Sequence, residues 1–191
     1  MGVQAELGGR ILVVCTGNIC RSPFIERVLR PELAGLDILV ESAGTGALVG
    51  EPIHPHAAEQ IRANGADSDN HVARQITSTL IEEADLVLTA TRRHRGDVAV
   101  MSPRALRRIF VWQDFADLVS SMSARKSSTR SQQGALRQVV SEVAGMRGSV
   151  PPRSAPEVDI VDPYRQGRDV FEQMGQQVMA SLPYVVRALR R

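Results

Sequence analysis

An apolar run that passes directly into a polar loop sets the main constraint on how this chain folds. Residues 11–14 read ILVV, a pattern typical of a buried β-strand, and residues 15–21 read CTGNICR, a loop that begins with a thiol and ends with a guanidinium. Ser22 and Pro23 follow, and we expect them to be the N-cap and the first residue of a helix. Backbone N–H groups of the loop and of the first helical turn would then converge on one oxyanion.

Several residues of this loop are suited to phosphate chemistry. Gly17 and Asn18 tolerate the left-handed backbone that turns N–H groups inward, and Arg21 is a planar partner for two phosphate oxygens. The same positive surroundings favour the thiolate of Cys15, which would be a nucleophile toward phosphorus. The alternative is a structural thiol at the end of a core strand, and with 22 arginines in the chain a Cys and an Arg at this spacing also arise by chance. Gly17 and Asn18 in the loop, and Ser22 and Pro23 just after it, favour a catalytic cysteine over a structural one.

Three further motifs follow the loop: residues 42–45 read SAGT, residues 71–74 read HVAR and residues 162–164 read DPY. Together with the loop, they resemble the low-molecular-weight protein tyrosine phosphatase family over about residues 10–190. The resemblance implies hydrolysis of phosphotyrosine in proteins through a phosphocysteine on Cys15. It further implies that Arg21 binds the phosphate and that Asp162 is the general acid and then the general base.

The resemblance also implies supporting roles. Ser42 and His71 would join Asn18 in a hydrogen-bond network that braces the loop, and the Ser22 hydroxyl would stabilise the thiolate when it leaves. Asp159 is a rival of Asp162 for the general-acid role, and only the PY that follows Asp162 separates the two. Contacts to the substrate are expected from Thr16, Gly17, Asn18, Ile19, Cys20, Ser22, Leu48 and Tyr164.

One segment departs from the family pattern and leaves the substrate class open. Many members carry an aromatic residue shortly after SAGT, whereas residues 46–50 read GALVG, so Tyr164 is the expected aromatic wall. Two alternative functions remain: an arsenate reductase that uses an external thiol, and a phosphotyrosine-binding regulatory module. No cysteine follows Cys20, which excludes a reductase that relays through C-terminal cysteines. Cys20 itself is either a resolving thiol for oxidised Cys15 or a small packing residue.

The order of the apolar segments predicts the fold class. Strands are expected at 10–14, 38–41, 84–89 and 109–111, in alternation with helices, which indicates an α/β fold with a parallel sheet covered on both faces. The resemblance adds that this is an open doubly wound sheet of four parallel strands. Residues 42–46 are expected as a turn after the second strand. In the first helix, the spacing predicts that Ile25, Val28 and Leu29 are buried and that Glu26, Arg27 and Arg30 face the solvent.

A length of 191 residues fits one domain. We expect a short leader at 1–9 and a single phosphatase domain at 10–191. Within it, the Ser/Thr-rich stretch at about 118–133 is expected to be a mobile surface loop, and the proline-rich stretch at about 148–158 an extended connector that delivers Asp162 to the site. A last helix is expected at 169–190.

Composition limits the partners. The net charge of +2 is too small to indicate nucleic-acid binding, and the basic cluster at 92–95, RRHR, is typical of a solvated surface. The N-terminus has no signal-peptide pattern, and no apolar stretch approaches about 18 residues, so we expect a cytoplasmic protein without membrane insertion. The histidines at 54 and 56 lack a further ligand cluster, so no metal or other cofactor is expected. The expected partners are a phosphotyrosine protein and a phosphate or other oxyanion; the oligomeric state is left open.

Overall fold

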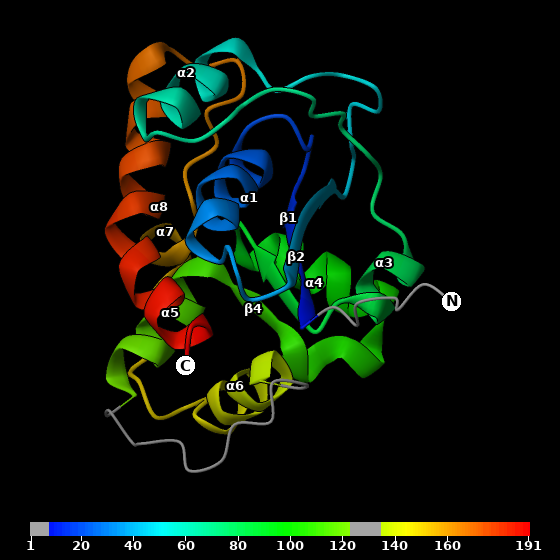
Figure 1. Cartoon of the computed structure of the whole chain (residues 1–191), viewed down its shortest axis with the longest axis vertical. Coiled ribbons are helices and arrows are strands. Elements are labelled where there is room, and N and C mark those ends of the chain that lie inside the picture. Colours follow the sequence, from blue (N-terminus) through cyan, green and yellow to red (C-terminus); the bar gives the residue numbers. More distant parts are fainter. Residues whose placement is uncertain (1–7, 123–134) are drawn as a thin grey trace.

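A four-stranded parallel sheet with helices on both faces forms the centre of the fold, as the sequence predicts (Figure 1). The structure is a computed structural model that describes residues 8–122 and 135–191. The strands are β1 (Gly9–Cys15), β2 (Ile38–Gly44), β3 (Leu86–Thr89) and β4 (Ile109–Val111), in the spatial order β2-β1-β3-β4. The helices are α1 (Arg21–Glu32), α2 (Pro55–Ala63), α3 (Ser78–Glu83), α4 (Arg92–Met101), the 3-10 helix η1 (Pro103–Arg108), α5 (Trp112–Ser121), α6 (Ala135–Gly145), α7 (Ala155–Val158) and α8 (Arg168–Leu189).

Alternation of side chains along β1 divides the core into two clusters. Ile11 and Val13 belong to a cluster that includes side chains of α1, α2, α5, α6 and α8. Leu12 and Val14 belong to a second cluster with side chains of α3, α4 and η1. Because β1 pairs with β2 on one side and with β3 on the other, the loop that leaves its carboxyl end emerges in the middle of the sheet edge. Ligands of open parallel sheets bind at this edge.

Two local predictions around this edge are wrong. Residues 42–44 are not a turn but the end of β2, because Ser42, Ala43 and Gly44 continue the ladder with the last residues of β1. Helix α1 begins at Arg21 with Cys20 as its N-cap residue, so Ser22 lies inside the helix. The Ser22 hydroxyl is not a cap because it contacts the Cys15 sulfur instead.

The predicted solvent-facing side of α1 is also partly wrong. Ile25, Val28 and Leu29 are buried and Arg30 is exposed, as predicted, but Glu26 and Arg27 are only 5% and 8% exposed. Glu26 is buried because its carboxylate accepts a hydrogen bond from Ser42 of β2 and also pairs with Arg30. A charged residue on this face therefore connects the helix to the sheet.

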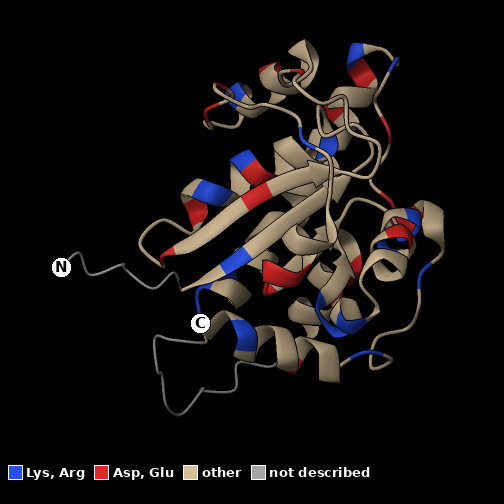
Figure 2. Cartoon of the chain, turned by 90° about the vertical axis from the view of Figure 1, so that its right-hand side faces the viewer, with Lys and Arg blue, Asp and Glu red and all other residues tan. Residues whose placement is uncertain are grey.

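Two predicted segments lie largely outside the described residues. These are residues 1–7 of the leader and residues 123–134 of the loop at 118–133, of which residues 118–121 form the last turn of α5. The connector at 148–158 is not extended throughout, since its last four residues form α7, where Ser154 and Glu157 make a reciprocal capping box. Basic and acidic positions are interspersed in the view of Figure 2, in keeping with the small net charge.

Candidate active site

The loop between β1 and α1 forms a cradle of unpaired backbone donors. Within the described residues, none of the backbone N–H groups of residues 16–22 donates to a protein acceptor. Asn18 adopts a positive φ of 56°, whereas Gly17, expected to share this conformation, does not. The left-handed residue at the centre turns the chain so that neighbouring N–H groups face inward. These donors, at the N-terminus of α1, form an anion site.

Arg21 and Asp162 form an ion pair at this cradle. Arg21 is the first residue of α1 and is buried, and its Nη2 is 2.8 Å from the Asp162 Oδ2. Its Nε is buried and has no hydrogen-bond partner among the described residues. Asp162 comes from the segment between α7 and α8, so the structure brings together two residues that are far apart in the sequence.

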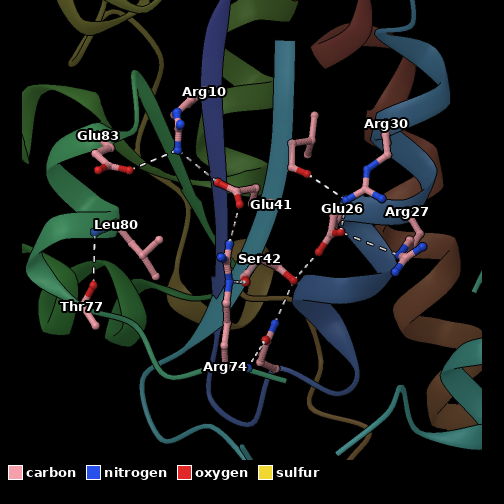
Figure 3. Close-up of polar contacts among 12 residues, drawn as sticks. Arg10, Glu26, Arg27, Arg30, Glu41, Ser42, Arg74, Thr77, Leu80 and Glu83 are labelled. Atoms are coloured by element: carbon pink, nitrogen blue, oxygen red, sulfur yellow. Dashed lines mark hydrogen bonds and ion pairs between the residues drawn. The ribbon is translucent and has the colours of Figure 1, made fainter. Parts of the chain in front are cut away.

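A chain of hydrogen bonds runs behind the loop to the Cys15 sulfur. Asn18 donates through Nδ2 to Ser22 Oγ at 2.9 Å and to Ser42 Oγ at 2.8 Å. Ser42 donates onward to Glu26 Oε2 at 2.5 Å (Figure 3). Because both Asn18 hydrogens are used, the Ser22 hydroxyl keeps its own hydrogen for Cys15 Sγ, 3.0 Å away. The buried serine therefore has a hydrogen available to donate to the Cys15 sulfur.

The other polar atoms of Asn18 are also bonded, which holds its left-handed conformation. Asn18 Oδ1 accepts from the backbone N–H of Arg74 at 2.9 Å, and His71 Nε2 lies 2.7 Å from the Asn18 carbonyl oxygen. Arg74 then donates to the carbonyl of Ser42 and pairs with Glu41 (Figure 3). The structure thus places Asn18, Ser42 and His71 in one network, and adds Glu26 and Arg74, for which the sequence carried no functional signal beyond the HVAR motif.

The segment that carries Asp162 is fastened to its surroundings. Asp159 Oδ1 accepts the backbone N–H of Arg92 at the start of α4, at 2.8 Å, so this carboxylate is occupied away from the cavity. The backbone N–H of Ile160 donates to the Ala90 carbonyl, and Asp162 Oδ1 accepts from the backbone N–H of Tyr164 at 3.2 Å. Of the two candidate acids, only Asp162 lines the cavity above the loop.

The cavity above the cradle has a volume of about 120 Å³ and mixed walls. Ile19, Leu48 and Tyr164 supply apolar surface, and Leu48 is held by a hydrogen bond from its N–H to the Gly17 carbonyl, at 3.0 Å. Asn18 and Ser22 do not line it, because their side chains are buried behind the loop. The lining residues are Cys15, Thr16, Gly17, Ile19, Cys20, Arg21, Gly46, Leu48, Asp162 and Tyr164.

The two cysteines are free, and their environments differ. Burial, reinforced by the charge of Cys15, raises the pKa of the Cys20 thiol to about 12. Cys20 is therefore held in the thiol form beside Cys15.

The histidines of the described residues do not form a metal site. No group of three or more His, Cys, Asp or Glu side chains there is arranged to hold a metal ion. His54 stacks on Phe171, with ring centroids 4.7 Å apart, and His56 pairs with Glu59. In the same part of the chain, no helix combines the length and apolarity that crossing a bilayer requires.

Comparison with known families agrees with this geometry. The model of the family described as low molecular weight phosphotyrosine protein phosphatase matches residues 10–124, more than half of the chain. The chain belongs to this family. Low molecular weight phosphatases are hydrolases of phosphate monoesters, and the cradle with Cys15 at its base lies within the matched residues.

Relatives of this phosphatase match about half of the chain by sequence, and solved structures match nearly all of it. The protein-tyrosine-phosphatase Wzb of Salmonella typhi is 42% identical over 103 residues, which cover 54% of this chain and 68% of that protein. The solved tyrosine phosphatase AmsI of Erwinia amylovora is 26% identical with a TM-score of 0.70, over 100% of this chain and 99% of the other. Wzb of Vibrio vulnificus, solved with benzylphosphonate, is 27% identical with a TM-score of 0.68, over 94% and 97%. Asp162 lies beyond the family-model match but within the AmsI alignment.

Proposed function

We propose that this phosphatase hydrolyses phosphotyrosine in protein substrates through a covalent phosphocysteine on Cys15. The observation that carries the proposal is that Cys15 lies at the start of a loop of free N–H groups and lines the same cavity as Arg21 and Asp162. A phosphate dianion in the cradle would present its phosphorus to the sulfur, and Arg21 would engage its outer oxygens.

In the first step, the Cys15 thiolate attacks phosphorus and the bond from phosphorus to the tyrosyl oxygen breaks. Arg21 and the loop N–H groups stabilise the charge on the transferring phosphoryl oxygens. Asp162 donates a proton to the tyrosyl oxygen, which avoids release of a phenolate whose conjugate acid has a pKa near 10. The ion pair with Asp162 occupies Nη2 of Arg21, and a guanidinium has five N–H donors in all. Arg21 can therefore turn its donors to the phosphate oxygens when Asp162 carries the proton that it gives to the tyrosyl oxygen.

In the second step, water attacks the phosphocysteine and the P–S bond breaks. The Asp162 carboxylate accepts a proton from that water, and the sulfur leaves as a thiolate. The Ser22 hydroxyl, 3.0 Å from the sulfur, stabilises this leaving group with the hydrogen that the Asn18 contacts leave available.

The apolar walls of the cavity support an aryl substrate. Ile19, Leu48 and Tyr164 line the cavity, and among the described residues that line it Tyr164 alone supplies an aromatic ring. These walls would bury a phenol ring, whereas a phosphoserine side chain is too short to reach them from the cradle. A reducing cytoplasm is the compartment we propose, because both cysteines are free thiols in the site.

The proposal is tested by phosphate release from matched phosphotyrosine and phosphoserine peptides. We expect turnover of the phosphotyrosine peptide, little of the phosphoserine peptide, and none of either by Cys15→Ser. Arsenate reduction with a glutaredoxin-type thiol donor is measured in parallel. Faster arsenate reduction than phosphotyrosine hydrolysis, or equal rates on the two peptides, would contradict the proposal.

A further inference from the structure

His94 lies on α4 and contacts Thr16, the residue that follows Cys15. Its Nε2 is 2.8 Å from Thr16 Oγ1, and its Nδ1 is 2.7 Å from Thr91 Oγ1. The histidine is 4% exposed. Two hydroxyl groups therefore hold a buried ring at both of its nitrogens, and one of them belongs to the phosphate loop.

The ring of His94 is neutral at the pH at which phosphatases are assayed. Burial, followed by the charge of Arg21, lowers the pKa of His94 to about 4. Arg93 acts in the same direction, and the carboxylates of Asp97 and Asp162 act against it. A neutral imidazole has one N–H donor and one acceptor nitrogen, so the two hydroxyl contacts must run in opposite senses.

Thr91 determines which nitrogen carries the hydrogen. Its Oγ1 accepts the backbone N–H of His94 at 3.2 Å, and it contacts no other acceptor than Nδ1 within the described part of the chain. If Nδ1 carried the hydrogen, the buried Thr91 hydroxyl would have nothing to donate to, which is unfavourable. Thr91 therefore donates to Nδ1, and Nε2 donates to Thr16 Oγ1.

This assignment leaves the hydroxyl hydrogen of Thr16 unused. Thr16 is exposed and lines the cavity with Cys15, Arg21 and Asp162. Among the described residues its Oγ1 has no hydrogen-bond partner besides His94, while its carbonyl oxygen accepts from the Gly46 N–H at 3.1 Å. The oxygens of a bound phosphate ester are the acceptors that this cavity would offer.

The frame that holds His94 is rigid at the start of α4. The backbone N–H of Arg92 is capped by Asp159, and the Ala90 carbonyl accepts from the Ile160 N–H at 2.9 Å. The same short segment thus contacts both the phosphate loop and the segment that leads to Asp162. A side chain anchored there can set the position of Thr16 with little loss of conformational entropy on substrate binding.

We propose that His94 is a positioning residue of the reaction: its Nε2–H donates to Thr16 and thereby directs the Thr16 hydroxyl hydrogen to an oxygen of the bound phosphate ester. The inference rests on the proposed function and adds a donor to its phosphate site. It concerns two residues of this chain that lie 78 positions apart and that local sequence patterns do not connect.

The test compares the inhibition constant of inorganic phosphate, kcat and KM among five variants. Thr16→Val removes the donor and should weaken phosphate binding about 10–100-fold, since a hydrogen bond to a charged group is worth about 1.5–3 kcal/mol. Thr16→Ser should recover most of that loss. His94→Gln places an amide near the position of Nε2 and should also recover binding, whereas His94→Asn reaches only the position of Nδ1 and should resemble Thr16→Val. His56→Asn, on α2 outside the cavity, is the matched histidine control and should leave all three values unchanged.

Two results would overturn the inference. One is an unchanged phosphate inhibition constant in Thr16→Val; the other is equal behaviour of His94→Gln and His94→Asn. Urea unfolding of each variant separates a loss of the fold from a loss of the donor. If the wild-type chain itself fails to hydrolyse phosphotyrosine, the proposed function is wrong. If the wild-type chain is active and Thr16→Val has an unchanged phosphate inhibition constant, only the role of His94 is refuted.

Discussion

Replacement of Gly44 by alanine should damage both the loop and the reaction, because the structure has no space for a methyl group there. Gly44 is the last residue of β2 and lies beside the phosphate loop. A Cβ atom built on it would be 2.2 Å from the backbone oxygen of Thr16 and 3.1 Å from Ala47. The close contact is with backbone, so no side-chain rotation relieves it.

The size of the effect follows from the displacement required. Real Cβ contacts essentially never fall below 3.0 Å, so Thr16 and Gly44 must separate by about 0.8 Å. Hydrogen bonds to the Arg74 carbonyl and from the Ile76 N–H hold Gly44, so the loop is the side that yields. Overpacking of this kind costs about 1–3 kcal/mol of stability. Misplacement of a reacting group by about 1 Å costs up to about 10²-fold in rate.

The assay is kcat/KM with nitrophenyl phosphate together with urea unfolding of the same preparation. We expect Gly44→Ala to lose about 10–100-fold in kcat/KM. Gly96→Ala, on α4 with nothing within 4 Å of its added methyl group, is the control and should leave activity unchanged. Activity of Gly44→Ala within two-fold of wild type, with unchanged stability, would refute the packing argument.

Three further predictions concern the acid, the second cysteine and pH. Asp162→Asn should slow the release of phenols of high pKa far more than the release of nitrophenol, while Asp159→Asn should mainly lower stability. If Asp159→Asn shows this dependence on the leaving group and Asp162→Asn does not, Asp159 is the general acid. After peroxide treatment, wild type should form a Cys15–Cys20 disulfide and regain activity with dithiothreitol, because oxidation of Cys15 removes one of the charges that raise the pKa of Cys20. Activity and mass are measured for wild type and Cys20→Ser, and equal recovery of the two proteins would show that Cys20 does not protect Cys15 from irreversible oxidation. Because the pKa of His94 is lowered to about 4, the unfolded chain takes up a proton that the folded chain refuses, so the free energy of unfolding should fall by about 2 kcal/mol from pH 7 to pH 5. In urea unfolding at the two pH values, the free energy of unfolding of His94→Gln should fall by about 2 kcal/mol less than that of wild type. An equal fall in both proteins would show that His94 does not cause this loss of stability.

Local patterns were sufficient to predict the sheet and the position of the loop. The ILVV run, the thiol after it and the helix after the loop are features of adjacent residues, and periodicity identifies the strand at 109–111 with its observed bounds. The parallel order of the strands follows from their alternation with helices. These predictions succeed because burial of an apolar strand is determined by the strand itself and its nearest connections.

The parts that sequence reasoning missed depend on contacts across the fold. Glu26 has a solvent-facing pattern in α1, yet it is buried because Ser42 of β2 supplies a hydrogen to its carboxylate. His94 belongs to a run of basic residues, yet it is buried against Thr16. The two candidate acids are distinguished by distant partners, because Asp159 accepts the backbone N–H of Arg92 at the start of α4 whereas Asp162 pairs with Arg21 at the cavity. Each of these partners lies at least 16 residues away, beyond the reach of helical or strand periodicity.

The most direct test of the mechanism is to trap the intermediate on the enzyme. Wild-type protein is quenched in acid during turnover of a phosphotyrosine peptide, digested, and analysed by mass spectrometry. The account predicts a phosphoryl group on the Cys15 sulfur, absent from Cys15→Ser, with an occupancy that rises in Asp162→Asn if the variant slows hydrolysis more than transfer. Turnover with no phosphorylated cysteine, or with the phosphoryl group on another residue, would contradict it.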